Sequence, residues 1–148
     1  MSLYRFKIYY PGKTKAKFIK EGIDHYIKLL SPFAKVELIE LKEGHGEKEK
    51  VIEEESRTIL NSLKGEFILL HKDGKSLSSP EFADFIKDKA VTQFVIGGVY
   101  GVNESVFKAA YCRLSLSSLT FTHEISRLLL LEQLYRAITI IHGKSYHY

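Results

Sequence analysis

Apolar and polar side chains alternate along the first segment of the chain. From Leu3 to Tyr10 aromatic or aliphatic residues occupy every second position, with Arg5 and Lys7 between them. A period of two sends successive side chains to opposite faces of a strand, and Pro11 with Gly12 closes the run. We therefore predict a strand over residues 3–10.

The pattern then changes to the three- and four-residue spacing of helices. Apolar residues recur in this way between residues 15 and 30, and Ser31-Pro32 ends the helix. A short helix is expected after Asn103 as its cap, and another after a loop over residues 71–79, with Ser79 as cap and Pro80 in its first turn. The other predicted elements are strands over 36–41, 67–70, 94–96 and 113–116, and helices over 48–63 and 123–141.

Strands that alternate with helices predict an α/β fold with a mostly parallel sheet flanked by helices. The 148 residues, 45% of them hydrophobic, are enough for one compact domain, and no linker or internal repeat divides them. We therefore expect a single domain over residues 1–148. The charged segment from Lys42 to Arg57 is interpreted as a solvated loop and helix face.

Composition narrows the classes of function only slightly. The net charge of +4 suits a partner rich in phosphate, although many proteins share it. A lone cysteine, Cys112, excludes an intramolecular disulfide framework and fits a reducing compartment. The chain has no long apolar run and no spacing typical of a metal site. We expect a cytoplasmic protein without a membrane span or a metal.

Ligands of open α/β sheets bind beyond the carboxyl ends of the strands, which places three loops under consideration: those after Leu70, Ile96 and Leu116. The second of them reads Gly97-Gly98-Val99-Tyr100-Gly101. Glycines allow positive φ angles and close approach of a ligand to the backbone. The loop is not the dinucleotide-binding fingerprint, which follows the first strand.

The loop from Leu116 to Phe121 carries three hydroxyls, Ser117, Ser118 and Thr120. These hydroxyls either cap the following helix, or the loop offers its backbone groups to the edge of a purine. Residue chemistry alone does not decide between the two.

The long helix contains four consecutive leucines, Leu128 to Leu131, and is apolar on nearly every side. We expect one side to pack on the sheet and another on a second subunit, which predicts a homodimer. Arg127 and Arg136 are nine residues apart and therefore face opposite sides. Arg136 either takes part in a site or simply pairs with Glu132 one turn earlier.

Several motifs in order resemble the RlmH family, SPOUT-class methyltransferases that modify N3 of a pseudouridine in 23S ribosomal RNA. They are F-V-I-G-G-x-x-G from Phe94, L-S-L-S-x-L-T-F-x-H-x-x-x-R from Leu114, E-Q-L-Y-R-A from Glu132 and G-K-x-Y-H from Gly143. The resemblance spans the chain and is most specific over residues 94–147. It implies S-adenosylmethionine as cofactor, a C-terminal trefoil knot, a homodimer and a large-subunit or whole-ribosome substrate.

The resemblance also implies functional residues. The family's cofactor contacts fall on Leu70, Gly97, Leu116, Ser117, Ser118, Leu119, Thr120 and Phe121, and its catalytic elements on Arg136, Tyr146 and His147. The chain departs from the family pattern at Val99 and Tyr100, at Ser145 where proline is common, and at Tyr148 where a basic residue is common. These departures affect the stiffness and charge of the tail.

The implied chemistry is direct displacement, in which N3 of the base attacks the methyl group on sulfur. Either His147 accepts the N3 proton, or Arg136 stabilises the anion that remains. Alternative interpretations are a SPOUT enzyme acting on transfer RNA or a free nucleotide, and a ribosome-associated RNA-binding factor without activity. A third is a flavodoxin-like or dinucleotide-binding domain that uses the glycine loop.

Overall fold

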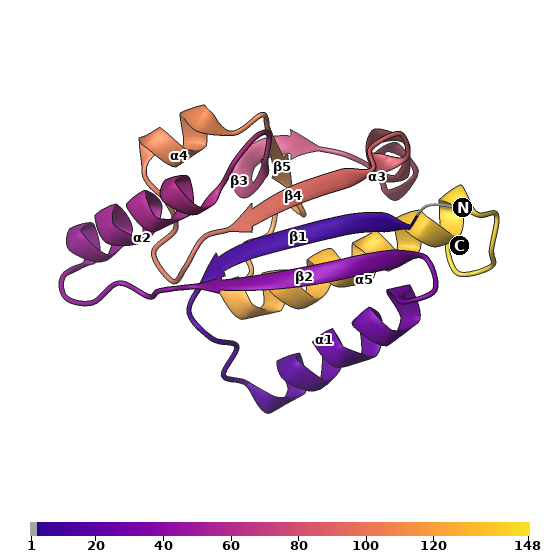
Figure 1. Cartoon of the computed structure of the whole chain (residues 1–148), viewed down its shortest axis with the longest axis horizontal. Helices are drawn as coiled ribbons and strands as arrows, with labels where there is room; N and C mark the ends of the chain where they lie inside the picture. Colours follow the sequence, from indigo (N-terminus) through magenta and orange to yellow (C-terminus); the bar gives the residue numbers. More distant parts are fainter. Residues whose placement is uncertain (1–2) are drawn as a thin grey trace.

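The computed structural model describes residues 3–148 and contains a five-stranded parallel sheet with the strand order β2-β1-β4-β3-β5 (Figure 1). Along the chain the elements are β1 (Tyr4–Pro11), α1 (Lys17–Leu30), β2 (Ala34–Leu41), α2 (Lys48–Ser62), β3 (Ile68–Ser76), α3 (Ser79–Ile86), β4 (Val91–Ile96), α4 (Glu104–Ala109), β5 (Cys112–Ser115) and α5 (His123–Ile141). The predicted α/β class and parallel sheet are confirmed. Strand β4 lies in the middle of the sheet.

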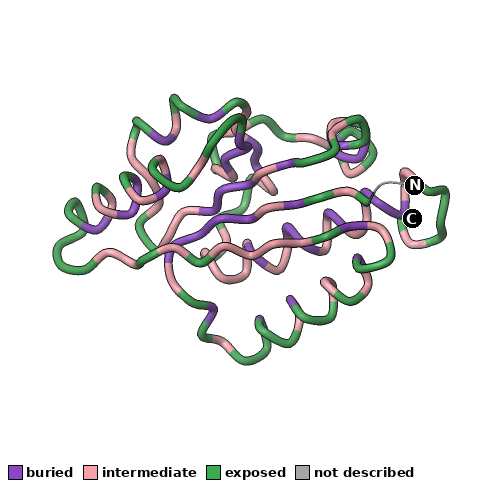
Figure 2. The backbone as a smooth tube through the Cα atoms, viewed as in Figure 1, coloured by how far each residue is buried: buried purple, intermediate pink, exposed green. Residues whose placement is uncertain are grey.

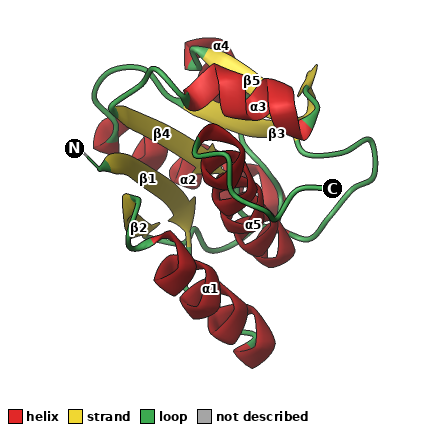
Figure 3. Ribbon diagram, turned by 90° about the vertical axis from the view of Figure 1, so that its right-hand side faces the viewer, coloured by secondary structure: helices red, strands yellow, loops and turns green. Residues whose placement is uncertain are grey.

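Helices cover both faces of the sheet. Helices α1, α3 and α5 pack on one face and share the larger hydrophobic core, while α2 and α4 enclose a smaller core on the other (Figure 3). Strands β1 and β4, in the interior of the sheet, are the most buried of the strands (Figure 2). None of the helices in residues 3–148 is long and apolar enough to cross a membrane.

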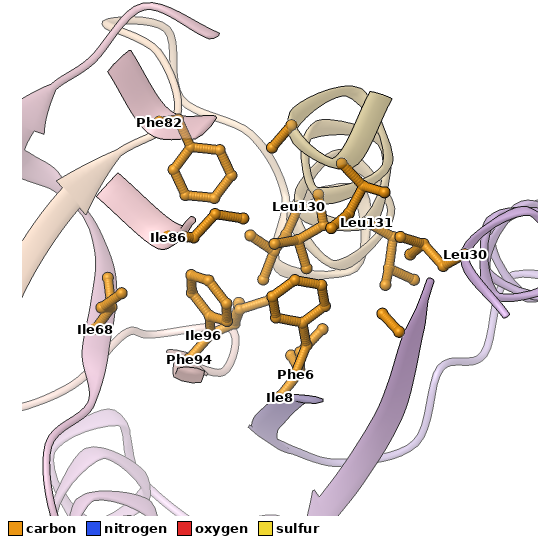
Figure 4. Packing of buried hydrophobic residues seen from close by; sticks show 14 of the residues in the cluster. Phe6, Ile8, Leu30, Ile68, Phe82, Ile86, Phe94, Ile96, Leu130 and Leu131 are labelled. Atoms are coloured by element: carbon orange, nitrogen blue, oxygen red, sulfur yellow. The ribbon is translucent and has the colours of Figure 1, made fainter. Parts of the chain in front are cut away.

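The alternation predicted for β1 builds the larger core. Phe6, Ile8 and Tyr10 lie on one face and are almost fully buried, whereas Tyr9 packs into the smaller core on the other face. The ring of Phe6 lies against that of Phe94 on β4, with 6.4 Å between centroids, and both face the leucines of α5 (Figure 4). Each such burial stabilises the fold by roughly 1.5–3 kcal/mol.

The segment after Leu70 differs from the prediction. A loop was expected over residues 71–79, but β3 continues to Ser76. Its register shifts between Leu70 and Lys75, which both pair with Leu114 of β5, so the residues between them bulge out of the ladder. The pairing in this segment uses backbone groups, whereas its side chains are polar and do not alternate with apolar ones. The sequence therefore showed no strand pattern here.

Two helix starts were predicted from their caps, and one is corrected. Asn103 caps α4 as expected, since its side chain accepts a hydrogen bond from the Val106 N–H at 3.2 Å. Helix α3 is capped by Ser78 rather than Ser79. The Ser78 hydroxyl accepts from the Glu81 N–H, and the Glu81 carboxylate accepts from the Ser78 N–H, which forms a capping box.

Helix α5 has the predicted bounds and is enclosed by the chain's own elements on three sides. It packs on the sheet and lies between α1 and α3. Leu128 fits against Gly22 of α1, where a Cβ atom would lie 2.8 Å from the leucine. The apolar flanks of α5 are therefore explained in part within one subunit, and the expected homodimer stays a prediction.

Candidate active site

The sheet register brings the three expected loops to one edge. Leu70 pairs with Ile96 on one side and with Leu114 on the other. Gly97 therefore follows directly beside Leu70, and Leu116 begins two residues beyond the Leu114 pair. The family-implied cofactor positions thus converge at the carboxyl ends of β3, β4 and β5.

The loop after β5 leaves its backbone groups open. Residues 117–121 make no backbone–backbone hydrogen bond within the described chain. Two of their backbone groups bond to nearby hydroxyls: Leu119 N–H donates to the Ser117 hydroxyl at 3.1 Å, and the Ser117 carbonyl accepts from the Ser115 hydroxyl at 2.8 Å. The expectation that the loop hydroxyls cap α5 is wrong. Thr122 does so instead, accepting from the Ile125 N–H at 3.3 Å. The alternative, a backbone surface offered to a ligand, remains.

A cleft of about 240 Å³ opens beside this loop, between α3 and α5; we call it the α3–α5 cleft. Its walls combine apolar and polar side chains: Leu77, Ser78, Ser79, Phe82, Leu114, Ser115, Leu116, Phe121, Leu129 and Gln133. Of the expected cofactor residues, Leu116 and Phe121 line it directly. Leu70, Gly97 and residues 117–120 flank it from the strand ends or the loop.

The glycine loop, residues 97–101, forms a tight turn at the end of the central strand. Gly101 has a φ of 80°, and its N–H donates to the Gly98 carbonyl at 3.1 Å. A Cβ atom on Gly97 would lie 3.1 Å from Gly101 Cα. The turn itself therefore explains the glycine at position 97, and close approach of a ligand there stays a prediction.

One residue of the charged segment contradicts the expected solvated face. Glu55 on α2 is only 2% exposed, and its Oε2 atom accepts a hydrogen bond from the Gly44 N–H at 2.9 Å. The sequence held a usable signal, because Val51 and Ile59, one turn before and after it, are apolar and buried. A residue between two such neighbours faces the core.

The catalytic residues implied by the resemblance form one cluster. Arg136 pairs with Glu132 at 3.1 Å, lies over the Tyr146 ring at 4.8 Å, and contacts His147 Nδ1 at 3.1 Å. The Tyr146 hydroxyl donates to Glu132 at 3.0 Å and lies 3.4 Å from the Tyr26 hydroxyl. Burial, followed by these two hydrogen bonds, raises the pKa of Tyr146 well above its usual value. The expected ion pair is present, and it joins a larger network.

Arg127 and Arg136 face opposite sides of α5, as predicted. Arg127 is 2% exposed, lies 3.9 Å over the Tyr10 ring, and donates to Pro11 O at 2.8 Å and Thr14 Oγ1 at 3.0 Å. It therefore holds the end of β1 inside the subunit. At 2% exposure its side chain is not available to a second subunit.

The cluster around Arg136 is distant from the glycine loop in the same subunit. His123, at the start of α5, lines a cleft together with Gly98. Arg136 follows thirteen residues later, which places it about 20 Å further along the helix axis. Figure 1 shows the C-terminus at the end of the molecule where β1 begins. One subunit thus keeps its tail and its glycine loop apart.

Comparison with known proteins agrees with the resemblance noted in the sequence. Residues 4–147 match the family described as "Predicted SPOUT methyltransferase". The ribosomal RNA large subunit methyltransferase H of Thermodesulfovibrio yellowstonii is 92% identical over 146 residues, which cover 99% of this chain and 100% of that protein. The proteins of the same name from Thermotoga maritima and Dictyoglomus thermophilum are 45% and 42% identical, over 97% and 96% of this chain and 99% and 98% of theirs. The chain belongs to the SPOUT methyltransferase family, in its ribosomal RNA large subunit methyltransferase H group.

Proposed function

We propose that the chain transfers a methyl group from S-adenosylmethionine to N3 of a pseudouridine in 23S ribosomal RNA, in the cytoplasm and on the assembled ribosome. The observation that carries this proposal is the 92% identity, over the full length of both chains, to a ribosomal RNA large subunit methyltransferase H. The retained glycine loop, the loop after β5 and the Tyr146-His147 pair support it.

The residues present fit the methyl donor. Leu114, Leu116 and Phe121 offer apolar walls for a flat ring, and Ser78 and Gln133 offer polar groups in the same cleft. The open backbone of residues 117–121 suits the hydrogen-bonding edge of an adenine. We assign donor binding to Leu70, Gly97 and residues 116–121. When bound, S-adenosylmethionine supplies an electrophilic methyl group on a positively charged sulfur.

The contacts among Arg136, Tyr146 and His147 favour one of the two catalytic roles: stabilisation of the anion by Arg136 rather than direct proton acceptance by His147. A guanidinium group only donates hydrogen bonds, so His147 Nδ1 is the acceptor in its contact with Arg136. The lone pair that would take a proton is thereby engaged. In this arrangement Arg136 stabilises the N3 anion, and His147 accepts a proton only after it leaves Arg136.

The active form in this proposal is a homodimer with shared sites. Arg136, Tyr146 and His147 lie too far from the glycine loop of their own subunit to act there, so a second subunit would supply them. The family's C-terminal trefoil knot is part of the same proposal. One observation supports the knot: the chain leaves the edge strand β5 and crosses to α5. Helix α5 packs against α1, which covers the opposite half of the sheet.

Incubation with radiolabelled methyl donor tests this function. Intact ribosomes, separated subunits and free RNA would be offered in parallel, followed by nucleoside analysis. We expect nucleoside analysis to find N3-methylpseudouridine in the samples that contain the large subunit. Label in transfer RNA would indicate the other SPOUT activity, and ribosome binding without any transfer would indicate a non-enzymatic factor; either result would overturn the proposal.

A further inference from the structure

A second cleft, of about 300 Å³, lies on the other side of the glycine loop; we call it the acceptor cleft. It opens at the carboxyl ends of β1, β2 and β4, with Lys13, Gly44, Gly98 and Tyr100 among its lining residues. The α3–α5 cleft lies at the ends of β3 and β5. Because β4 is the central strand, its glycine loop separates the two clefts. None of the cofactor positions implied by the resemblance lines the acceptor cleft.

The floor of the acceptor cleft holds a carboxylate with one free oxygen. Glu55 Oε2 accepts from the Gly44 N–H, but Oε1 is buried and has no hydrogen-bond partner in the described chain. The hydrogen bond to the Gly44 segment accounts for Oε2. No contact within the described chain accounts for Oε1. A buried acceptor without a donor costs about 1–3 kcal/mol, so its retention points to a donor that arrives with a ligand.

The glycine loop controls access to this oxygen. A Cβ atom on Gly98 would collide with Glu55 Oε1, so only a glycine fits beside the carboxylate. Val99 and Tyr100 at the tip of the loop are 67% and 47% exposed. Glu55 and Tyr100 both line the acceptor cleft, where a base can stack on the tyrosine ring.

The chemistry of the acceptor base matches this arrangement, given the proposed function. Uridine and pseudouridine both carry N3–H, but in pseudouridine the sugar is attached through carbon, so N1 also carries a hydrogen. N1 and N3 point about 120° apart around the ring. With N3 in contact with the methyl group of the donor at the edge of the glycine loop, N1–H is directed away from the donor, toward the Glu55 side.

We propose that the acceptor cleft receives the pseudouridine ring and that Glu55 Oε1 accepts a hydrogen bond from its N1–H, which makes Glu55 the residue that distinguishes pseudouridine from uridine. The inference rests on the proposed function and adds a specificity-determining residue to it. A uridine in the same place presents no N1–H and leaves the buried oxygen unpaired. Sites built around such a hydrogen bond discriminate strongly against the analogue that lacks it.

The substitution Glu55→Gln tests this with little change of shape. The cleft needs two acceptors, one for the Gly44 N–H and one for N1–H, and an amide has a single acceptor oxygen. Purified variants would receive ribosomes with either pseudouridine or uridine at the acceptor position, and kcat/KM would be measured for both. We expect the wild-type protein to prefer pseudouridine by at least about a hundredfold, and Glu55→Gln to lose most of that preference.

Glu53→Gln is the matched control, because Glu53 lies on the same helix with its side chain in solvent, paired with Arg57. It should keep the wild-type preference. Affinity for S-adenosylmethionine, measured by calorimetry, should be the same in all three proteins. If Glu55→Gln lowers kcat/KM by the same factor for the ribosomes with pseudouridine and for those with uridine, Glu55 is structural and the inference is overturned. If the wild-type protein methylates neither ribosome, the proposed function fails, and this inference fails with it.

Discussion

Glu55 and Arg127 are both charged and almost completely buried, but the structure satisfies them differently. Arg127 has a carbonyl, a hydroxyl and an aromatic face around its guanidinium group. Its Nε atom has no hydrogen-bond partner in the described chain, but these contacts surround the charge and fix the end of β1 to α5. Glu55 has one N–H for two oxygens. Its burial is therefore a net cost to the fold, of the kind found at functional sites.

That cost predicts a pH-dependent effect on stability. Burial raises the pKa of Glu55, and the nearby carboxylates of Glu43 and Glu54 add to the rise, while the Gly44 N–H and His45 oppose it. A carboxyl whose pKa is higher in the folded state gives stability at low pH that is lost as pH rises through that pKa. At pH 7 the neutral Glu55→Gln side chain should therefore stabilise the protein, by about 1 kcal/mol.

Denaturant unfolding of both proteins at pH 7 and pH 4 measures this difference. At pH 4 Glu55 is largely protonated in the folded state, so the two free energies of unfolding should converge. A Glu55→Gln protein that is less stable at both values would show that the carboxylate supports the fold, contrary to this account. Gained stability together with lost selectivity is the combination expected of a residue kept for function.

At the scale of elements, two helices begin at the edge of the sheet that carries the candidate site. The start of one is fixed by its own side chain, and the start of the other by a side chain from a different helix. Thr122 caps α5 locally. Helix α1 has no side-chain cap of its own; instead Glu124, in the first turn of α5, accepts from the N–H groups of Lys15 and Ala16 at 3.1 and 3.0 Å. The start of α5 therefore anchors the segment between β1 and α1, which forms one wall of the acceptor cleft.

The capping arrangement separates structural from ligand-binding hydroxyls in the loop after β5. Thr122→Ala should lower the free energy of unfolding by about 1 kcal/mol, because it leaves the Ile125 N–H without its acceptor. Ser118→Ala should change it by less than about 0.5 kcal/mol, since Ser118 is exposed and outside the cap. Thermal unfolding of both variants provides the measurement. Equal losses would mean that the loop, rather than Thr122, holds the helix.

The elements that sequence patterns predicted well are those whose side chains report their burial. The alternation of β1 and the bounds of α5 follow directly from apolar spacing, and the loops after Ile96 and Leu116 were placed at the correct edge. The second half of β3 was missed because its pairing uses backbone groups beside polar side chains. Ser79 was named as the cap of α3 although Ser78 caps it; the position of Glu81, three residues after Ser78, is the signal that distinguishes the two serines.

The site was predictable to a similar degree. The family motifs pointed to the positions around Leu70, Gly97 and the loop after β5. Residue spacing alone did not decide whether that loop caps the next helix or binds a ligand. Glu55 was overlooked because charge density in the segment outweighed its place between Val51 and Ile59. The network that holds Tyr146 joins residues far apart in sequence, and no periodicity relates Tyr26 to a residue 120 positions later.

At the scale of the whole molecule, the glycine loop of the central strand lies between two clefts of different character. The α3–α5 cleft offers open backbone and apolar walls, and the acceptor cleft offers a carboxylate and lysines. Displacement at a methyl group requires the attacking atom to contact the methyl carbon on the side opposite the leaving sulfur, so donor and acceptor should meet at the edge of this loop, one from each cleft. Glycines leave room there because they carry no side chain.

In the proposed function, the position of the tail leaves one subunit without a complete active site. Arg136, Tyr146 and His147 are held together at the far end of α5, so removal of residues 146–148 should spare donor binding while sharply reducing turnover. A chain with Gly97→Val should have the opposite defect. Its larger side chain meets the Gly101 backbone and distorts the glycine loop, so donor binding should fall while the tail stays intact.

Mixing these two defective chains distinguishes shared from separate sites. If the tail of one subunit serves the glycine loop of the other, each mixed dimer contains one site with an intact loop and an intact tail. Random exchange of equal amounts makes about half of all dimers mixed, so activity should recover to about a quarter of the wild-type value per subunit. If each tail serves its own subunit, every site lacks one part and activity stays near zero. Light scattering must first show a dimer at micromolar concentration, and exchange must be demonstrated with differently tagged chains; a monomer, or exchanged dimers without recovered activity, would refute the shared site.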